Sequence, residues 1–178
     1  MILTAKQEEG LKIAVARYKA HEAYTCISGY AGTGKSTLIK FIIAALGLEP
    51  EQVCYVAYTG KAAQVLKQKG CPNPYTAHKL LYKAKPMPNG TFKFEPKTSL
   101  DEGLEVIIVD EVSMLPKEMW LRLLSHRIHV IACGDPFQLP PIEKDEDNHL
   151  LDHPHIFLDE IMRQATESGI IRLTMDIR

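Results

Sequence analysis

A chain of 178 residues, 46% hydrophobic and 24% charged, has enough apolar side chains to bury the core of one ordinary domain. Its formal net charge of -1 excludes a basic field over the whole surface, although one basic groove is compatible with a neutral total. No apolar run reaches the roughly 20 residues of a membrane span, and the N-terminal segment lacks the apolar core of a signal peptide.

Helical and strand-like patterns alternate through most of the chain. They predict a helix at 4–20, a strand at 23–28, a helix at 35–46, a strand at 52–58, a helix at 60–70, a strand at 104–111, a helix at 116–125 and a strand at 127–135. This alternation is typical of an α/β fold with a doubly wound parallel sheet and helices on both faces. In such sheets ligands bind beyond the carboxyl ends of the strands.

Residues 83–103 break this rhythm. Asn89-Gly90 is a strong hairpin turn signal, and residues 91–94 alternate like a strand. The segment therefore predicts a small β-hairpin inserted into the sheet domain, with a surface loop as the alternative.

The four cysteines point to reduced thiols. Cys26, Cys54, Cys71 and Cys133 form no CxxC pair, and three of them lie in apolar, strand-like runs. Burial in a cytoplasmic protein is favoured over zinc binding or disulfides.

Residues 29–36, GYAGTGKS, match the phosphate-binding pattern GxxxxGK[ST] between a predicted strand and a predicted helix. Backbone N–H groups of such a loop surround the β-phosphate, and the helix N-terminus favours its negative charge. Lys35 is expected to reach the β- and γ-phosphates, and Ser36 to bind Mg²⁺. The predicted nucleotide contacts in this segment are Gly29, Ala31, Gly32, Thr33, Gly34, Lys35, Ser36 and Thr37.

Two acids follow the strand predicted at 104–111, at the same sheet edge. Asp110 is expected to hold Mg²⁺ through its water shell, and Glu111 to act as general base for the attacking water. The alternative is an acidic loop without a catalytic role. Asp135 and Gln138 follow the next strand, and Gln138 would contact the γ-phosphate, unless GDPFQLPP is only a rigid turn.

Five motifs in this order resemble one family: AGTGKST at 31–37, AYTGKAA at 57–63, TAHKLL at 76–81, DEVSM at 110–114 and GDPFQLPP at 134–141. Together they look like the first RecA-like motor domain of a superfamily 1 DNA helicase, in the 5′→3′ branch of RecD and Dda. The resemblance covers nearly the whole chain. It implies a P-loop NTPase fold, ATP hydrolysis with Mg²⁺, 5′→3′ movement on single-stranded DNA and unwinding of forked duplexes. It also implies the cytoplasm of a bacterial or phage-infected cell, and contacts with other replication or recombination proteins.

The resemblance implies two further nucleotide contacts. Gln7 matches the glutamine that reads the adenine edge, and Arg163 matches an arginine that touches the γ-phosphate. The alternatives are an ordinary exposed helix residue at Gln7 and a surface salt bridge at Arg163.

The resemblance also implies DNA contacts. Thr59, Gly60 and Lys61 match a segment that grips single-strand phosphates, and Thr76 and His78 match a second one. A small glycine permits close approach of phosphate, and a lysine supplies counter-charge. His78 has a plainer alternative as a polar group at a helix N-terminus.

The hairpin at 83–103 lies where these helicases have a strand-separating pin. Phe94, with Phe92, would then stack on a base at the fork, or the two rings would simply pack the hairpin onto the domain.

The chain lacks the later motifs of the family, so residues 1–178 are expected to be one motor domain without its second domain. Two other functions remain open: a P-loop ATPase that does not unwind, similar to PhoH, and a nucleic-acid-binding regulatory module.

Overall fold

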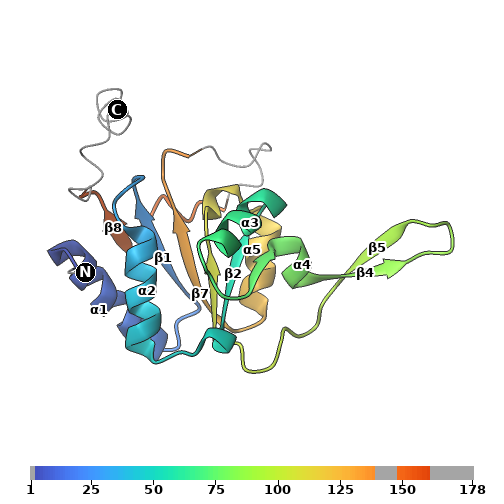
Figure 1. The fold of residues 1–178 in the computed structure, drawn as a ribbon, viewed down its shortest axis with the longest axis horizontal. Helices are drawn as coiled ribbons and strands as arrows, with labels where there is room; N and C mark the ends of the chain where they lie inside the picture. Colours follow the sequence, from blue (N-terminus) through green and yellow to red (C-terminus); the bar gives the residue numbers. More distant parts are fainter. Residues whose placement is uncertain (1–2, 139–147, 161–178) are drawn as a thin grey trace.

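The computed structural model describes residues 3–138 and 148–160. Six strands in these ranges form a parallel sheet in the order β3-β2-β6-β7-β1-β8. They are β1 (Tyr24–Gly29), β2 (Val53–Ala57), β3 (Pro74–Thr76), β6 (Val106–Val109), β7 (His129–Gly134) and β8 (Ile156–Leu158). Parallel neighbours require crossovers over the faces of the sheet, and Figure 1 shows helices on both sides. This confirms the predicted fold class.

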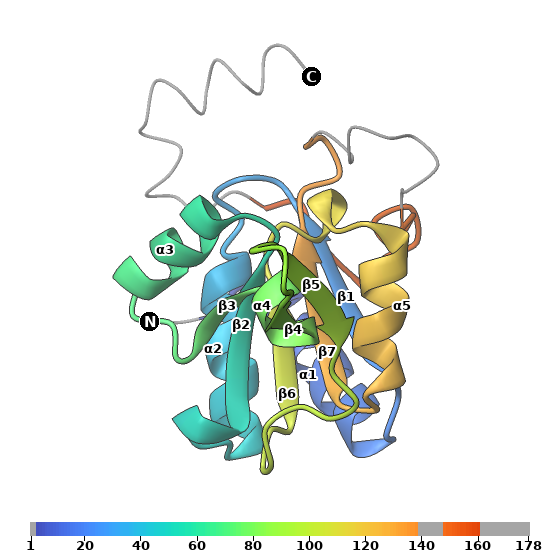
Figure 2. The ribbon, with the colours of Figure 1, turned by 90° about the vertical axis from the view of Figure 1, so that its right-hand side faces the viewer.

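Two apolar cores lie on the two faces of the sheet. One packs under α1 (Ala5–Lys19), α2 (Lys35–Leu46) and α3 (Gly60–Gln68), and the other under α4 (Ala77–Leu81) and α5 (Lys117–Ser125). Figure 2 shows α5 and α2 on opposite sides of the strands. Short 3-10 turns, η1 (Pro50–Gln52) and η2 (Val112–Met114), precede β2 and follow β6.

The position of β6 inside the sheet explains why its sequence does not alternate between polar and apolar residues. Val106 and Ile108 belong to the core under α1 to α3, whereas Ile107 and Val109 belong to the core under α5. All four are at most 1% exposed. A strand covered by helices on both faces needs apolar side chains at every position.

The predicted helices and central strands are confirmed to within two residues at most ends, and α2 has the predicted bounds. The sequence patterns did not predict β3 or β8, and α4 was expected only in the alternative that placed His78 at a helix N-terminus. The two strands lie at the two edges of the sheet and have three residues each, too few to display a period. Pro74, which cannot donate to a ladder, is tolerated in β3 because that strand is at an edge.

The inserted hairpin is present, but it is shorter than predicted. Strands β4 (Tyr82–Pro86) and β5 (Phe92–Pro96) pair in antiparallel fashion, and residues 97–103 return to the sheet without strand structure. The turn is closed by bonds from the N–H of Met87 to the Thr91 carbonyl and from the N–H of Gly90 to the Met87 carbonyl, with Gly90 at φ 79°. Figure 1 shows the hairpin projecting away from the body of the domain.

All four cysteines are free thiols, and Cys26, Cys54 and Cys133 are buried in the cores, as predicted. Among the described residues, no helix combines the length and apolar character needed to cross a bilayer.

Candidate nucleotide and nucleic-acid site

Strand order brings the predicted motifs to one edge of the sheet. The phosphate-binding loop follows β1, the acid pair follows β6, and the turn at 135–138 follows β7, which lies between them. The strands are parallel, so all three segments emerge at the same carboxyl edge, at the top of Figure 2.

The phosphate-binding loop is held in a tight, glycine-dependent conformation. Gly32 and Gly34 have φ of 80° and 83°, in the left-handed region that suits glycine. A Cβ on Gly29 would lie 2.5 Å from the Leu158 carbonyl oxygen and 2.9 Å from Thr33 Oγ1, so only glycine fits between the loop and β8. Thr33 is buried and donates its hydroxyl to the Tyr30 carbonyl at 2.9 Å.

Lys35 is the first residue of α2, and its side chain turns back over the loop. Its Nζ donates to the carbonyl oxygens of Gly29 at 2.7 Å and Tyr30 at 3.0 Å. The ammonium therefore lies within the loop whose backbone is expected to surround phosphate.

Gln7 joins α1 to the loop. Its side chain is 1% exposed, which rules out an ordinary exposed helix residue. Its Oε1 accepts from the N–H of Thr4 in a capping box, and its Nε2 donates to the Thr33 carbonyl at 3.1 Å. The amide is thus fixed against the phosphate-binding loop.

The acids Asp110 and Glu111 occupy the bend between β6 and η2. The N–H of Asp110 donates to the Val56 carbonyl, and one oxygen of its carboxylate accepts from the N–H of Glu111 at 3.1 Å. Glu111 has φ 54° and ψ 50°, a left-handed conformation that a glutamate rarely adopts. Such conformations cost on the order of 1–3 kcal/mol and occur often at functional sites.

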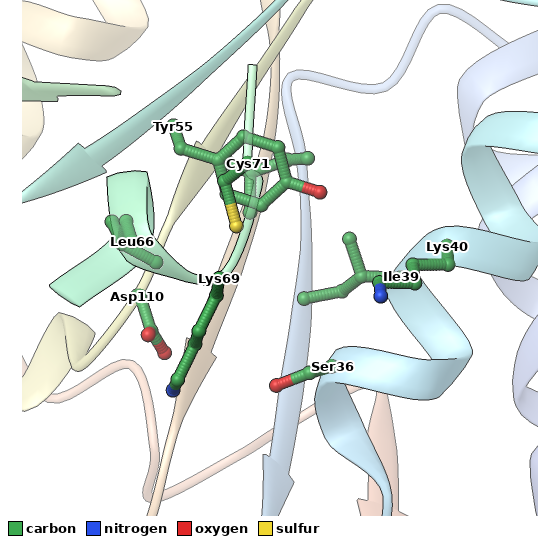
Figure 3. Close-up of a pocket in the computed structure, with 9 residues that line it drawn as sticks. Ser36, Ile39, Lys40, Tyr55, Leu66, Lys69, Cys71 and Asp110 are labelled. Atoms are coloured by element: carbon green, nitrogen blue, oxygen red, sulfur yellow. The ribbon is translucent and has the colours of Figure 1, made fainter. Parts of the chain in front are cut away.

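A cavity of about 280 Å³ lies between α2, α3 and the sheet (Figure 3). The Ser36 hydroxyl and the Asp110 carboxylate line one end of it. The other lining residues are Ile39, Lys40, Tyr55, Leu66, Lys69, Cys71 and Ile108.

The donors at this end fit Mg²⁺. A hydroxyl and a carboxylate are hard oxygen ligands, and Mg²⁺ usually keeps several waters and takes few protein ligands. No cluster of three or more His, Cys, Asp or Glu side chains suited to a metal occurs in the described ranges.

Thiols near this site are not reactive nucleophiles. Burial raises the pKa of Cys133 to about 12, and the Asp110 charge adds to that effect. Burial also raises the pKa of Cys71, and the Asp110 carboxylate raises it further, while Lys40 and Lys69 oppose it. Both cysteines are therefore protonated at neutral pH.

The turn after β7 brings an amide to the same edge. Asp135 is buried and accepts from the N–H of Phe137 at 3.0 Å, and the N–H of Gln138 donates to the Asp135 carbonyl. The Gln138 side chain is exposed. Arg163, the other predicted γ-phosphate contact, lies outside the described residues.

The two segments predicted to grip DNA lie side by side. Thr59 caps α3 and Thr76 caps α4, each accepting from a backbone N–H at 3.2 Å, and Thr76 pairs in register with Ala57 at the end of β2. Gly60 and Lys61 are exposed, and a Cβ on Gly60 would meet nothing within 4 Å.

Beside these segments is a row of three rings. The exposed His78 ring lies 6.4 Å from the ring of Tyr58 and 5.8 Å from that of Tyr82. Tyr82 begins β4, so the row connects the Thr76 segment to the hairpin. At the hairpin Phe92 and Phe94 are 63% and 60% exposed, which contradicts a role in packing the hairpin onto the domain.

A family model described as "AAA domain" matches residues 3–178. The chain belongs to the AAA domain family. Within it, the chain is similar to the first motor domain of superfamily 1 helicases in the branch of RecD and Dda, which confirms the resemblance drawn from the five motifs.

Relatives of this AAA domain are longer proteins. The "ATP-dependent DNA helicase dda" of Enterobacteria phage T4 is 30% identical over 187 aligned residues, covering 99% of this chain and 42% of the relative. The "RecBCD enzyme subunit RecD" of Mycolicibacterium smegmatis is 28% identical over 157 residues, covering 73% of this chain and 28% of the relative. The chain thus spans less than half of either relative.

Solved structures agree on the fold. Pif1 helicase from Candida albicans has a TM-score of 0.63 and 25% identity, covering 97% of this chain and 43% of that one. Bacteroides sp Pif1, solved in complex with ADP-AlF4, has a TM-score of 0.61 at 22% identity, which shows the fold alone.

Several features of the AAA domain gave no signal in the sequence. The left-handed backbone of Glu111 follows a strand in which nothing marks a bend. Leu66 of α3 and Lys69, which follows α3, line the cavity but belong to no motif, because their positions depend on how α3 lies against β2 and β3. For Leu66 the helical spacing from Ala62 and Ala63 is consistent with a buried position, but it does not indicate a cavity.

Proposed function

We propose that the chain is the ATP-hydrolysing first motor domain of a DNA helicase that moves 5′→3′ on single strands and unwinds duplexes. One observation supports this most strongly: the phosphate-binding loop, the acid pair and the two phosphate-gripping segments share one edge of one sheet. The phage T4 relative, which is named as an ATP-dependent DNA helicase, agrees with it.

In this proposal the loop and α2 bind ATP. Backbone N–H groups of residues 29–36 surround the phosphates, and Lys35 exchanges its carbonyl partners for β- and γ-phosphate oxygens. Ser36 and Asp110 would hold Mg²⁺, which supplies charge neutralisation at the phosphates. Gln7, whose amide is held on the Thr33 carbonyl beside the loop, is proposed to read the adenine edge.

Hydrolysis needs a base and groups that sense the γ-phosphate. The Glu111 carboxylate accepts the proton of the attacking water. The exposed amide of Gln138 is available to a γ-phosphate oxygen, and Arg163 is proposed for the same group from its sequence motif alone.

DNA phosphates would lie over the N-terminus of α3. Thr59 satisfies the N–H of Ala62, and helix geometry leaves the N–H groups of Gly60 and Lys61 without intrahelical acceptors. These N–H groups and the Lys61 ammonium suit a phosphate. Thr76 and His78 extend this surface toward the hairpin. None of these groups distinguishes one base from another or contacts a 2′-hydroxyl, so the domain would recognise the phosphate backbone of the nucleic acid.

The hairpin would act as the pin that separates strands. Phe92 and Phe94 are two residues apart on β5 and therefore project to the same side of the hairpin. Exposed aromatic rings stack on bases of any sequence. Lys83, Lys85 and Lys93 add positive charge to the two strands.

Replacing Phe94 with alanine is expected to weaken binding of a forked oligonucleotide about 10-fold, because one base stack contributes roughly 1–3 kcal/mol. The melting temperature should not change, since the ring is mostly exposed. Fluorescence anisotropy measures the affinity. Leu121→Ala, which removes an exposed apolar side chain from α5, is the matched control. Equal losses in affinity and in DNA-stimulated hydrolysis would argue against the pin.

A helicase also needs a second motor domain, which we expect in a longer native chain, together with partners in replication or recombination. Action on DNA in the cytoplasm of a bacterial or phage-infected cell is part of the same proposal.

Stimulation by single-stranded DNA tests the function. ATP hydrolysis is measured with and without oligo(dT), on this chain and on a longer native chain with a second motor domain. The proposal expects slow hydrolysis by this chain and clear stimulation of the longer one. Hydrolysis in the longer chain without DNA binding or stimulation would favour a P-loop ATPase that does not unwind. DNA binding without any hydrolysis would favour a regulatory module.

A further inference from the structure

The cavity between α2 and α3 contains a lysine that no motif explains. Lys69 follows the last residue of α3, and its side chain lines the cavity together with Ser36 and Asp110. In Figure 3 it extends toward the end of the cavity where the Ser36 hydroxyl and the Asp110 carboxylate lie. An ammonium therefore faces the two side chains proposed to bind Mg²⁺.

The backbone fixes where Lys69 begins. Its N–H donates to the Val65 carbonyl, and Gly70, at φ 74°, donates to the Lys67 carbonyl. The N–H of Cys71 donates to the carbonyl of Leu66, the buried residue of α3. This closed helix end holds the Lys69 stem over the cavity.

The charges in the cavity are near one another. Asp110, Lys40 and Lys69 all line the cavity. The Asp110 carboxylate raises the pKa of the Cys71 thiol, and the two ammonium groups lower it. Within the described ranges, neither a hydrogen bond nor an ion pair engages Lys69 Nζ. The Asp110 carboxylate lies at the same end of the cavity, is partly exposed and accepts one bond from its own loop.

A monovalent ammonium and a divalent cation compete for the same carboxylate. Repulsion between them grows as they approach. Lys69 is an exposed residue, so solvent and salt screen part of this repulsion, and the effect is largest at low salt. Lysine is flexible and well hydrated, so Mg²⁺ can displace the ammonium, but the free energy of displacing it weakens Mg²⁺ binding.

We propose that Lys69 is a positioning residue that competes with the divalent cation for Asp110 and so sets the Mg²⁺ concentration at which the nucleotide site fills. This rests on the proposed Mg²⁺–nucleotide site. The side chain does not touch the reacting phosphate, and its effect acts through Asp110.

Metal binding measured without turnover tests the role. Free Mn²⁺ is titrated by EPR into the chain with ADP, at low salt, where surface charge is least screened. Lys69→Gln is expected to lower the apparent Kd for Mn²⁺ about 5- to 10-fold, because a repelling charge is removed. Lys69→Arg, which keeps the charge, should remain within about 2-fold of the parent chain.

Lys67→Gln is the matched control. Lys67 is an exposed lysine on the last turn of the same helix and does not line the cavity, so its loss removes equal net charge without changing the affinity for Mn²⁺. Thermal unfolding checks that all variants fold.

The outcomes separate the two proposals. Unchanged or weaker Mn²⁺ binding in Lys69→Gln, with normal binding in the parent chain, overturns the role of Lys69 alone. Equal tightening in Lys67→Gln also overturns it, since a long-range charge effect would then suffice. A parent chain that binds no Mn²⁺ with ADP overturns the nucleotide site itself.

Discussion

Replacing Lys35 with alanine is expected to reduce ATP hydrolysis at least about 100-fold, the loss typical of removing one group that stabilises charge on the transferring phosphate. Lys35 is the cation placed within the phosphate-binding loop, at 2.7 Å from the Gly29 carbonyl and 3.0 Å from that of Tyr30. In the proposed site, its removal would deprive the β- and γ-phosphates of their counter-charge. Hydrolysis is measured as phosphate release at saturating Mg²⁺.

The fold should survive this change. The Lys35 side chain is not part of either apolar core, so its loss removes two hydrogen bonds and no core packing. Each such bond contributes about 1 kcal/mol at most in a half-exposed position. Lys12→Ala, an exposed lysine of α1, controls for the loss of one charge. Full hydrolysis in Lys35→Ala would mean that the loop does not bind the phosphates as proposed.

The parts of the fold that the sequence predicted are those with long apolar patterns. The four consecutive apolar residues of β6 predict a buried strand. The loop motif before α2 and Gly47 after it mark both ends of that helix. The edge strands β3 and β8 have three residues each, and their pairing depends on the neighbours β2 and β1. Short edge strands are defined by tertiary contacts, which a local pattern cannot contain.

The residues of the candidate site also fall into those that the sequence predicted and those that depend on tertiary packing. Lys35, Ser36 and Asp110 were predicted because each follows a strand whose end is visible in the sequence. The burial of Gln7 was not predicted, because it depends on the contact between α1 and the loop that the Gln7 amide makes with the Thr33 carbonyl. The position of Lys69 likewise depends on the packing of α3 against β2 and β3.

A substitution at Glu111 is expected to change the rate of ATP hydrolysis without changing the affinity for ATP. Replacing it with glutamine is expected to reduce hydrolysis about 10²- to 10⁴-fold, the usual contribution of a general base. ATP affinity, measured by equilibrium binding, should stay within about 2-fold, because glutamine keeps the shape of the side chain and the proposed phosphate contacts come from other residues. Single-turnover hydrolysis then reports the chemical step alone.

The neighbouring acid supplies the contrast. Asp110→Asn should raise the Mg²⁺ concentration needed for half-maximal ATP binding, whereas Glu111→Gln should leave it unchanged, since only Asp110 lines the cavity with Ser36. The backbone at Glu111 is left-handed and turns the chain directly after Asp110, and in the proposed function the two adjacent carboxylates have different roles. If Glu111→Gln instead weakened Mg²⁺ and ATP binding as Asp110→Asn does, both acids would be metal-binding groups and the general base would have to be sought elsewhere.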